Sequence, residues 1–565
     1  MRRFVSFVGV TLLVAVACTT TPAGQPQSPG GQAVAGGRVV VGSFSDLKTM
    51  QPVISADSAS SDRWNFIYQG LTRTSKDTGA VEPNLADKFE LSSDGLTLTY
   101  TLRDGVVWSD GSPFTGDDYK LTAMAVARSK KTTRKDAFTN VTGFNDFKDG
   151  KAEDISGIQV TDNGKKVTIK FDKVYCGAIY RLGSAGTGGI IPKKVFGKYI
   201  DPKDPSKNLD DAPENMNPPL SIGPFVFKEY KPGDTWTAVR NDKYFRGAPL
   251  VDEVVVKVYA DATAVKAALL TGEISFYNIE AKDYDEVKKS DLLKEYHFSG
   301  SNGYTYIGWN ELSAKAPWLA DKRVRQALWY GLNVDAIYQK ILFGQGRRQF
   351  GDTPPTVGWA YDDSDLNKYP YDVNKAKQLL EQAGAKMGSD GVYRWTDGTP
   401  MKMRIETNQG NNARETILQF AQEQYRQIGI QIDPLLEAFP ALTERSDPTN
   451  ADLQGYILGW IGLGPSMDDY AIWHSSQRGP KQFNSVNYVN ATVDRALSDN
   501  RDGPDCSQAA RKKALHAIDK QLNEDAPYTF LYSADVLLFF NKTVQGADPG
   551  VWSTIWNVEK WWVKR

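Results

Sequence analysis

The residues best suited to bind a small molecule lie in residues 458–470, directly after a strand predicted at residues 453–458. Trp460 offers a flat aromatic surface there, and Asp468 and Asp469 offer two carboxylates. A general acid and a general base must flank a substrate, and two neighbouring carboxylates do not show that arrangement. The stretch therefore favours ligand binding over catalysis. The two carboxylates are equally consistent with a helix cap or a solvated loop.

Other kinds of chemistry find no support in the residue pattern. The three histidines, His297, His474 and His516, are far apart, and none has a partner at metal-ligand spacing. The sequence contains no phosphate-binding loop, no G-x-S-x-G and no H-E-x-x-H pattern. We therefore expect no catalytic residues, no metal and no cofactor, and we expect that the protein is not an enzyme. A secreted hydrolase is the alternative from another class of function.

Composition argues against two classes of partner. The chain carries 67 Lys and Arg residues against 68 Asp and Glu residues, a net charge of -1. A balance of this kind does not favour nucleic acid or an acidic membrane surface as the main partner. The aromatic content is high, with 14 Trp, 26 Tyr and 24 Phe residues. Large cores and strands use such side chains, and the alternative is that some of them line a ligand cavity.

One stretch shows how the scaffold is built. In residues 97–102 threonines alternate with Leu and Tyr, which predicts a half-buried strand. Arg103-Asp104-Gly105 supplies a turn. Thr115 is suited to cap a helix, and acidic residues at 117 and 118 meet the positive end of the helix dipole. We expect that helix to run through Ala127.

The same stretch carries a resemblance to a known family. The order S-x-D-G-L-T-x-T-Y-x-L-R-x-G-V-x-W-S-D-G-x-P-x-T-x-D-D in residues 92–118 resembles the signature of the family 5 extracytoplasmic solute-binding proteins of ABC transporters. The order N-D-x-Y-F-R-G-x-P in residues 241–249 and the strand at 304–310 are further matches. The resemblance covers nearly all of residues 38–565. It implies capture of a ligand by hinge closure and delivery to a membrane permease.

The implied fold class is α/β: a two-lobed periplasmic-binding-protein fold of type II, with an extra inserted domain and mixed sheets covered by helices. A chain of 565 residues is too long for one compact core. Alternation of helices and strands between residues 374 and 435 predicts a parallel part of a sheet. The predicted boundaries are lobe I at 38–62, 189–299 and 527–565, the inserted domain at 63–188, and lobe II at 300–526. The chain is predicted to cross between lobes near residues 299–304 and 526–532.

The resemblance also bears on the ligand. In peptide binders of the family, a Gly-Trp is followed within a few residues by an aspartate that pairs with the α-ammonium of the ligand. Here Gly459 and Trp460 are present, but no acid follows before Asp468. A buried ammonium without a counter-charge is costly, so Asp468 or Asp469 must substitute if a peptide binds. Otherwise the ligand lacks an amine, as an oligosaccharide does, and stacks on Trp460 and Trp309.

Oligopeptide is the first choice of ligand and oligosaccharide the second. Nickel is disfavoured because histidines are scarce. The family alignment also brings Asp57 and Ser58 to the cleft, where a solvated polar loop is the alternative interpretation. The predicted ligand-binding residues are Asp57, Ser58, Trp309, Gly459, Trp460, Ile461, Gly462, Asp468 and Asp469.

The start of the chain predicts export and anchoring. Arg2 and Arg3 precede an apolar run at residues 4–17, which is too short to span a bilayer comfortably. The order Ala-Val-Ala-Cys ending at Cys18 resembles a bacterial lipobox, with Ala in place of the usual Leu. We expect a signal peptide at 1–17, lipidation of Cys18 and a flexible tether at 18–37. The protein is then a monomer anchored by lipid to the outside of the cell membrane.

Two cysteines remain, Cys176 and Cys506. In an exported protein two cysteines suggest a disulfide. The predicted boundaries place them in different lobes, however, where a bond would oppose hinge movement. We therefore expect two separate thiols.

Overall fold

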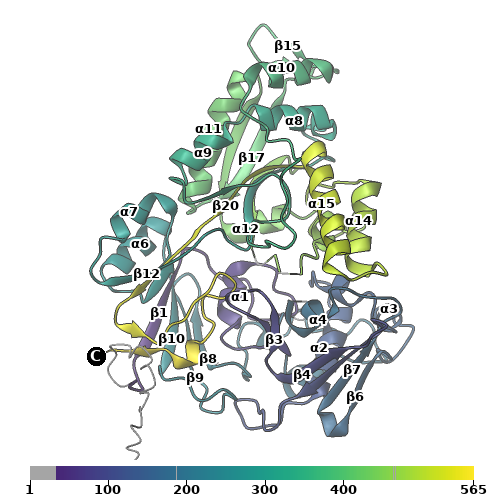
Figure 1. Ribbon diagram of the computed structural model, residues 1–565, viewed down its shortest axis with the longest axis vertical. Helices are drawn as coiled ribbons and strands as arrows, with labels where there is room; N and C mark the ends of the chain where they lie inside the picture. The colour runs from purple at the N-terminus through teal and green to yellow at the C-terminus, as the bar shows by residue number, and fades with distance from the viewer. Residues whose placement is uncertain (1–32, 186–187, 462, 465, 565) are drawn as a thin grey trace, which may run out of the picture. The chain divides into compact units, whose positions relative to one another are not determined.

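Two mixed β-sheets organise the computed structural model, which describes residues 33–185, 188–461, 463–464 and 466–564 (Figure 1). The predicted signal peptide, Cys18 and most of the predicted tether lie outside the described residues. None of the described helices is long and apolar enough to cross a membrane.

The lobe I sheet contains seven strands in the order β12-β21-β11-β1-β10-β9-β8. In its centre β1 runs parallel to β10, whereas β9 runs antiparallel to β10, so the sheet is mixed. Helix α6 packs against β1, where a Cβ at Gly42 would come within 2.4 Å of Val265 Cγ1, so only glycine permits this approach. The elements are β1 (Arg38–Ser43), β8 (Phe225–Lys231), β9 (Thr235–Arg240), β10 (Glu253–Val258), α6 (Ala262–Leu270), β11 (Phe276–Asn278), α7 (Tyr284–Val287), β12 (Leu293–Phe298) and β21 (Val536–Asn541).

The inserted domain has a four-stranded antiparallel sheet, β4-β5-β7-β6. Strand β5 has the predicted bounds. Thr115 caps α2 in a capping box with Asp118, and the helix ends at Arg128, one residue later than predicted. The elements are α1 (Ser58–Trp64), β2 (Thr72–Thr74), β3 (Val81–Pro83), β4 (Ala86–Leu91), β5 (Thr97–Leu102), α2 (Gly116–Arg128), α3 (Phe144–Lys148), β6 (Ile158–Thr161), β7 (Lys166–Lys170), α4 (Ala178–Tyr180) and α5 (Lys193–Phe196).

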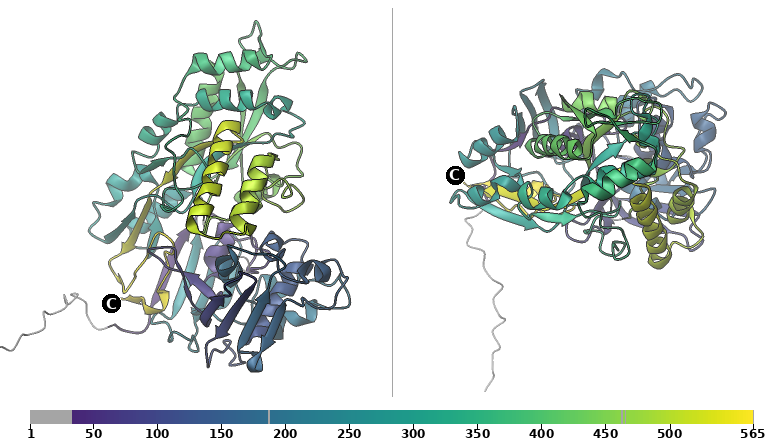
Figure 2. Two further views of the ribbon diagram at one scale, coloured as in Figure 1. Left: turned by 45° about the vertical axis from the view of Figure 1, so that its right-hand side comes forward. Right: turned by 90° about the horizontal axis from the view of Figure 1, so that it is seen from above.

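The lobe II sheet has the order β14-β20-β13-β19-β17-β18. Strands β17 and β18 pair in parallel and α11 packs on both, which confirms the predicted parallel part. Helices α14 and α15 lie side by side (Figure 2). The elements are β13 (Tyr304–Trp309), α8 (Lys322–Tyr330), α9 (Val334–Lys340), β14 (Gly346–Arg348), α10 (Val373–Gln382), β15 (Lys386–Met387), β16 (Tyr393–Arg394), β17 (Lys402–Asn408), α11 (Asn412–Gln427), β18 (Gln431–Glu437), α12 (Phe439–Arg445), β19 (Gly455–Trp460), α13 (Tyr470–Trp473), α14 (Ala491–Asp502), α15 (Gln508–Asp525) and β20 (Tyr528–Ala534). After β21 of the lobe I sheet, the chain forms the short strands β22 (Val544–Gln545) and β23 (Trp562–Val563), which pair with each other.

The second crossing between the sheets lies later than predicted. Strand β20 pairs with β13 of lobe II, with Tyr306 opposite Phe530, and only β21 joins the lobe I sheet (Figure 1). The predicted start of the last lobe I segment at residue 527 is therefore wrong, because the chain leaves lobe II at Asp535. Asp535 Oδ1 accepts the N–H of Gly300 at 2.7 Å, so the two crossing segments are bonded to each other.

Buried apolar side chains form separate cores. One core joins lobe I to the inserted domain and includes Trp108 and Trp236, and another lies within lobe II around Trp309 and Trp329. The crossing segments therefore join bodies that each contain a separate apolar core.

Cys176 and Cys506 form a disulfide across 330 residues of sequence. The predicted pair of separate thiols is therefore wrong. The two cysteines do belong to different bodies, since Cys176 precedes α4 of the inserted domain and Cys506 lies between α14 and α15 of lobe II. Sequence separation says nothing of distance, and the fold brings the two Cα atoms to 5.1 Å.

Candidate functional site

A cavity of about 140 Å³ lies between the inserted domain and lobe II. Tyr180 and Arg181 line it from the end of α4, and the remaining lining residues come from lobe II. A Cβ at Gly464 would come within 2.2 Å of the Tyr180 ring, so a glycine lets the two bodies approach here. The lobe II residues are Trp460, Leu463, Gly464, Ser466, Asp468, Asp469, Ala471, Ile472 and Phe483.

Trp460 is the last residue of β19 and supplies an aromatic wall of the cavity. Its ring stacks on Tyr306 at a centroid distance of 6.3 Å and meets Phe483 edge-on at 5.5 Å. Its Nε1 donates to the hydroxyl of Tyr528 at 3.3 Å. A Cβ at Gly303 would come within 1.9 Å of the Trp460 carbonyl oxygen, so Gly303 is required for this placement of the strand end. Trp460 is thus held rigidly, as a ligand platform requires.

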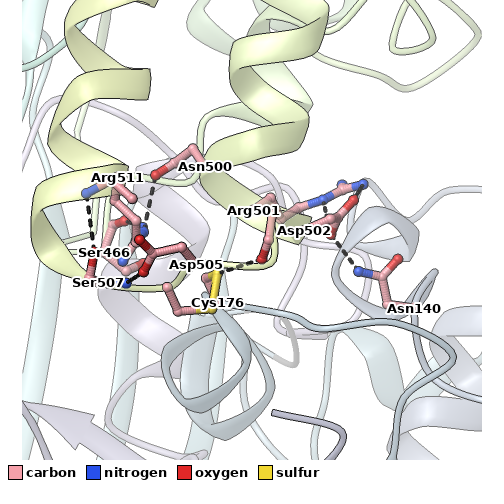
Figure 3. Close-up of a disulfide and its surroundings, with 12 residues drawn as sticks. Asn140, Cys176, Ser466, Asn500, Arg501, Asp502, Asp505, Ser507 and Arg511 are labelled. Atoms are coloured by element: carbon pink, nitrogen blue, oxygen red, sulfur yellow. Dashed lines mark hydrogen bonds and ion pairs between the residues drawn. A yellow bond between two sulfur atoms is a disulfide. The ribbon is translucent and has the colours of Figure 1, made fainter. Parts of the chain in front are cut away.

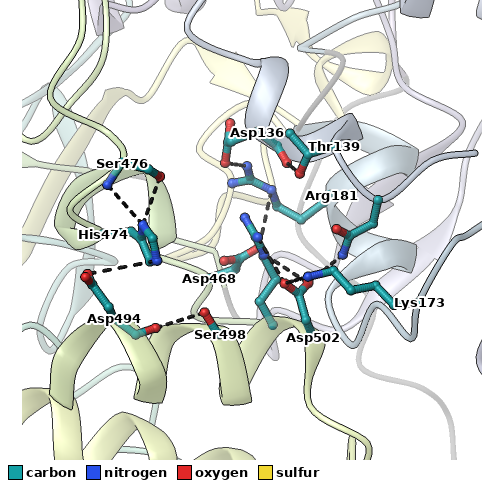
Figure 4. Close-up of polar contacts among 12 residues, drawn as sticks. Asp136, Thr139, Lys173, Arg181, Asp468, His474, Ser476, Asp494, Ser498 and Asp502 are labelled. Atoms are coloured by element: carbon teal, nitrogen blue, oxygen red, sulfur yellow. Dashed lines mark hydrogen bonds and ion pairs between the residues drawn. The ribbon is translucent and has the colours of Figure 1, made fainter. Parts of the chain in front are cut away.

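Asp468 pairs with a cation of the other body. Its Oδ2 lies 3.6 Å from Arg181 Nε, and Arg181 also forms an ion pair with Asp136 (Figure 4). Asp468 and Asp469 are only 8% and 6% exposed, respectively. The interpretation of this acidic pair as a solvated loop is therefore wrong. Asp469 does occupy the cap position of α13, but its side chain makes no capping hydrogen bond.

Asp469, unlike Asp468, forms no ion pair among the described residues, and Arg181 only partly offsets the effect of burial on its pKa. Burial, together with the neighbouring carboxylates of Asp352 and Asp468, raises the pKa of Asp469 well above its usual range. Its Oδ2 has no hydrogen-bond partner among the described residues. Asp352, by contrast, accepts a hydrogen bond from the hydroxyl of Tyr304. Asp469 is therefore a buried carboxyl that a cation from outside would stabilise.

Arg414, near the start of α11, is a cation for which the structure shows no carboxylate partner among the described residues. Its Nη1 donates to Asn408 Oδ1 at 2.9 Å, and it forms no ion pair in the part of the chain that the structure describes. A Cβ at Gly459 would come within 3.0 Å of Arg414 Nη2, so the guanidinium lies against the strand that ends in Trp460. An arginine in the first turn of a helix is normally exposed, and no pattern in the sequence marks this one.

Trp309 does not contact the cavity. It is completely buried in the core of lobe II, and its Nε1 donates to Thr529 Oγ1 at 3.0 Å. The prediction that a ligand stacks on it is therefore wrong. Alternation along a strand shows which residues of β13 share a face. It does not show that the face with Trp309 is the one that packs against Tyr425 of helix α11.

The remaining predicted residues lie outside the cavity lining. Asp57 caps α1, with its two carboxylate oxygens accepting from the N–H and the hydroxyl of Ser60 at 2.8 and 2.9 Å. Ser58 is the first residue of that helix. Gly459 precedes Trp460 in β19, Ile461 is 63% exposed, and Gly462 lies outside the described residues.

The two cavity residues from the inserted domain, Tyr180 and Arg181, were missed by the sequence reasoning. They lie more than 270 residues before Trp460, in a short helical segment without a marked polar pattern. Their role follows only from the approach of two bodies that are distant in sequence.

The fold, with two α/β lobes, an inserted domain and a cavity of this kind between bodies, defines a two-lobed solute-binding protein. Residues 80–482 match the family model of bacterial extracellular solute-binding proteins, family 5 (middle part), and the chain belongs to this family. The predicted family and fold class are thereby confirmed.

Several relatives are similar over most of their length. The oligopeptide-binding protein AppA of Bacillus subtilis is 32% identical over 545 residues, which are 96% of this chain and 93% of that protein. The oligopeptide-binding protein OppA of Lactococcus lactis subsp. cremoris is 29% identical and covers 77% of this chain and 74% of its own. The structure of AppA from Bacillus subtilis in complex with a nonapeptide matches with a TM-score of 0.83 and 31% identity, over 94% of this chain and 100% of that one. These relatives are binding proteins rather than enzymes.

Proposed function

We propose that this protein binds oligopeptides outside the cytoplasm by closing its lobes around them and delivers them to the permease of an ABC transporter. The observation that carries the proposal is the buried carboxyl of Asp469 in the cavity, which forms no ion pair among the described residues. The α-ammonium of a peptide would supply a cation for that carboxyl. Similarity to two oligopeptide-binding proteins supports the same ligand class.

Asp469 suits this role better than Asp468. Asp468 already lies 3.6 Å from Arg181, whereas Asp469 lies between two further carboxyl groups. When a peptide ammonium approaches, it favours the ionised form of Asp469 and displaces the proton that burial retains. Peptide binding therefore releases a proton and weakens as the pH is lowered.

Arg414 provides the complementary charge. A guanidinium with no carboxylate partner in the described chain, lying against Gly459, is suited to receive a carboxylate of the ligand. A peptide backbone carries an ammonium and a carboxylate, so it satisfies both groups. Trp460 supplies stacking area in the cavity wall.

The proposal includes the anchoring that the first residues predict. The charged, apolar and small-residue order that ends at Cys18 supports cleavage of a signal peptide and lipidation of that cysteine. A lipid anchor holds the protein at the outer face of the cell membrane, where it meets its permease. Monomers suffice, because both sides of the described cavity come from one chain.

The test begins with mass spectrometry of small molecules released when the purified full-length protein is denatured, and we expect peptides. Calorimetry then compares a released peptide with its N-acetylated form on wild type and on Asp469→Asn. Losing one partner of a buried charge pair costs about 3–5 kcal/mol, so Asp469→Asn should weaken binding at least about a hundredfold. Acetylation should weaken wild type similarly and should not weaken the variant further. Asp433→Asn, at a largely exposed carboxylate, is the matched control.

Trp460 in the cavity wall keeps an oligosaccharide as the second candidate, because sugars stack on aromatic rings. In that case the released molecules are sugars, Asp469→Asn changes affinity little, and Trp460→Ala abolishes binding. Release of sugars alone would overturn the peptide proposal.

A further inference from the structure

The Cys176–Cys506 disulfide bridges the two bodies that line the cavity (Figure 3). Cys176 lies four residues before Tyr180, which lines the cavity from the inserted domain. Cys506 lies in the loop that joins α14 to α15 of lobe II. The bond is therefore a covalent connection across the interface that a ligand must pass.

Polar contacts surround the disulfide and cross the same interface. The N–H of Cys176 donates to the carbonyl oxygen of Arg501 at 2.8 Å. Asp502 of lobe II pairs with Lys173 Nζ at 2.7 Å and also accepts from Asn140 of the inserted domain. These contacts favour the same arrangement of the two bodies as the disulfide does. The Lys173 side chain is 55% exposed, so its ion pair with Asp502 is weak. The pair between Arg181 and Asp468 crosses the same interface and is shielded, but like the other contacts it is non-covalent and can break and re-form.

We propose that this disulfide is a redox-controlled clasp on the binding cavity. In the oxidised protein the inserted domain and lobe II cannot separate at this edge, and ligand exchange through it is slow. In the reduced protein only the polar contacts remain, and the two bodies separate. The inference rests on the proposed function, since it describes how access to that same site is regulated.

The two sulfur atoms differ in accessibility, which defines the exchange reaction. Cys506 is exposed and Cys176 is half-buried. The thiolate of a dithiol reductant attacks the sulfur of Cys506 and forms a mixed disulfide, while Cys176 leaves as a thiolate and takes up a proton. The second thiol of the reductant, as a thiolate, then attacks the reductant sulfur atom that is bonded to Cys506. Cys506 leaves as a thiolate and takes up a proton. Two electrons pass to the protein, and the reductant ends as a disulfide.

A protein dithiol of the kind that carries a Cys-x-x-Cys motif is the class of partner that fits this step, because its second cysteine resolves the mixed disulfide. Dithiothreitol performs the same chemistry and serves as the probe. Re-oxidation needs a disulfide of the same class as oxidant, which takes the two electrons back.

The test uses the full-length protein and a nonapeptide that carries a fluorophore near its carboxyl end. Stopped-flow competition with unlabelled peptide gives the dissociation rate before and after treatment with dithiothreitol. Reduction should raise that rate about tenfold or more, because the covalent constraint between the inserted domain and lobe II is removed. Cys176→Ser and Cys506→Ser should show the fast rate and no response to dithiothreitol. Equal dissociation rates in the oxidised and reduced wild type would overturn the proposal.

Hydrogen exchange without peptide provides a second readout. Amides of residues 178–184 and 466–473 should lose protection on reduction, whereas amides of the lobe I strands β9 and β10 should not change. If peptide binds in neither redox state but this protection still falls, the proposed function fails and the clasp stands. If peptide binds and neither the rate nor the protection responds, the clasp fails alone. Should a serine variant fail to fold, chemical reduction of wild type gives the same comparison.

Discussion

Arg181 of the inserted domain lies with its Nε 3.6 Å from Oδ2 of Asp468 in lobe II. Their side chains are 16% and 2% exposed, respectively, so the pair is shielded from water and salt. Arg181 also neutralises Asp136 of its own domain. One guanidinium thus compensates two carboxylates and joins the two walls of the cavity.

Replacement of Arg181 by methionine should destabilise the protein by about 3–5 kcal/mol, because it leaves Asp136 buried without its ion-pair partner and removes one of the cations near Asp468, where Arg501 remains. Thermal unfolding measures this loss. The double variant Arg181→Met with Asp468→Asn should recover part of it, since one uncompensated charge is removed as well. Losses that simply add in the double variant would show that the two side chains do not interact.

Two tryptophans allow binding and stability to be separated. Trp309→Ala opens a hole in the lobe II core and should cost about 3–5 kcal/mol of stability, with unchanged peptide affinity in the folded fraction. Trp460→Ala removes a wall of the cavity and should weaken peptide binding about tenfold to a hundredfold, with the smaller loss of stability. Calorimetry and denaturant unfolding on both variants measure these effects. An affinity loss confined to Trp309→Ala would refute the described cavity as the binding site.

The buried carboxyl of Asp519 should make the free energy of unfolding depend on pH. Its Oδ1 accepts the N–H groups of Asp352 and Thr353 at 2.6 and 3.0 Å, and burial beside the Asp352 carboxyl raises its pKa to about 7. The unfolded chain loses this proton near the usual aspartate pKa of about 4, whereas the folded protein retains it until about pH 7. The carboxyl therefore destabilises the fold increasingly as pH rises through this window.

Asp519→Asn keeps an acceptor oxygen and removes the charge. It should raise the free energy of unfolding at pH 8, by at most about 4 kcal/mol, and change it little at pH 4. Asp433→Asn, at an exposed carboxylate, controls for the charge change itself. An equal effect of Asp519→Asn at both pH values would contradict a raised pKa.

If Cys18 is lipidated, replacing it should change how the protein divides between the membrane and soluble fractions of the cell. Cys18→Ser should move the protein from the membrane fraction to the soluble fraction, because the acyl chains that hold it are no longer attached. Cys506→Ser is the matched control, since it also replaces a cysteine by serine but leaves the anchor. Membrane association of Cys18→Ser equal to that of the parent would show that another segment anchors the protein.

The sequence by itself determined the family, the α/β class and those elements that depend on neighbouring residues. Alternation at residues 97–102 specifies β5, and Thr115 with Asp118 specifies the start of α2, because the interactions that form them lie within a few positions. The sequence also singled out Trp460, Asp468 and Asp469 after a predicted strand, and all three line the cavity.

Only the tertiary structure decided which partners these elements meet. The pairing of β20 with lobe II, the burial of Trp309 and the bond between Cys176 and Cys506 all join residues separated by more than 200 positions. The same holds for the approach of Arg181 to Asp468. Burial, strand register and pKa depend on what lies across a contact in space, and a local pattern of residues carries no information on that neighbour.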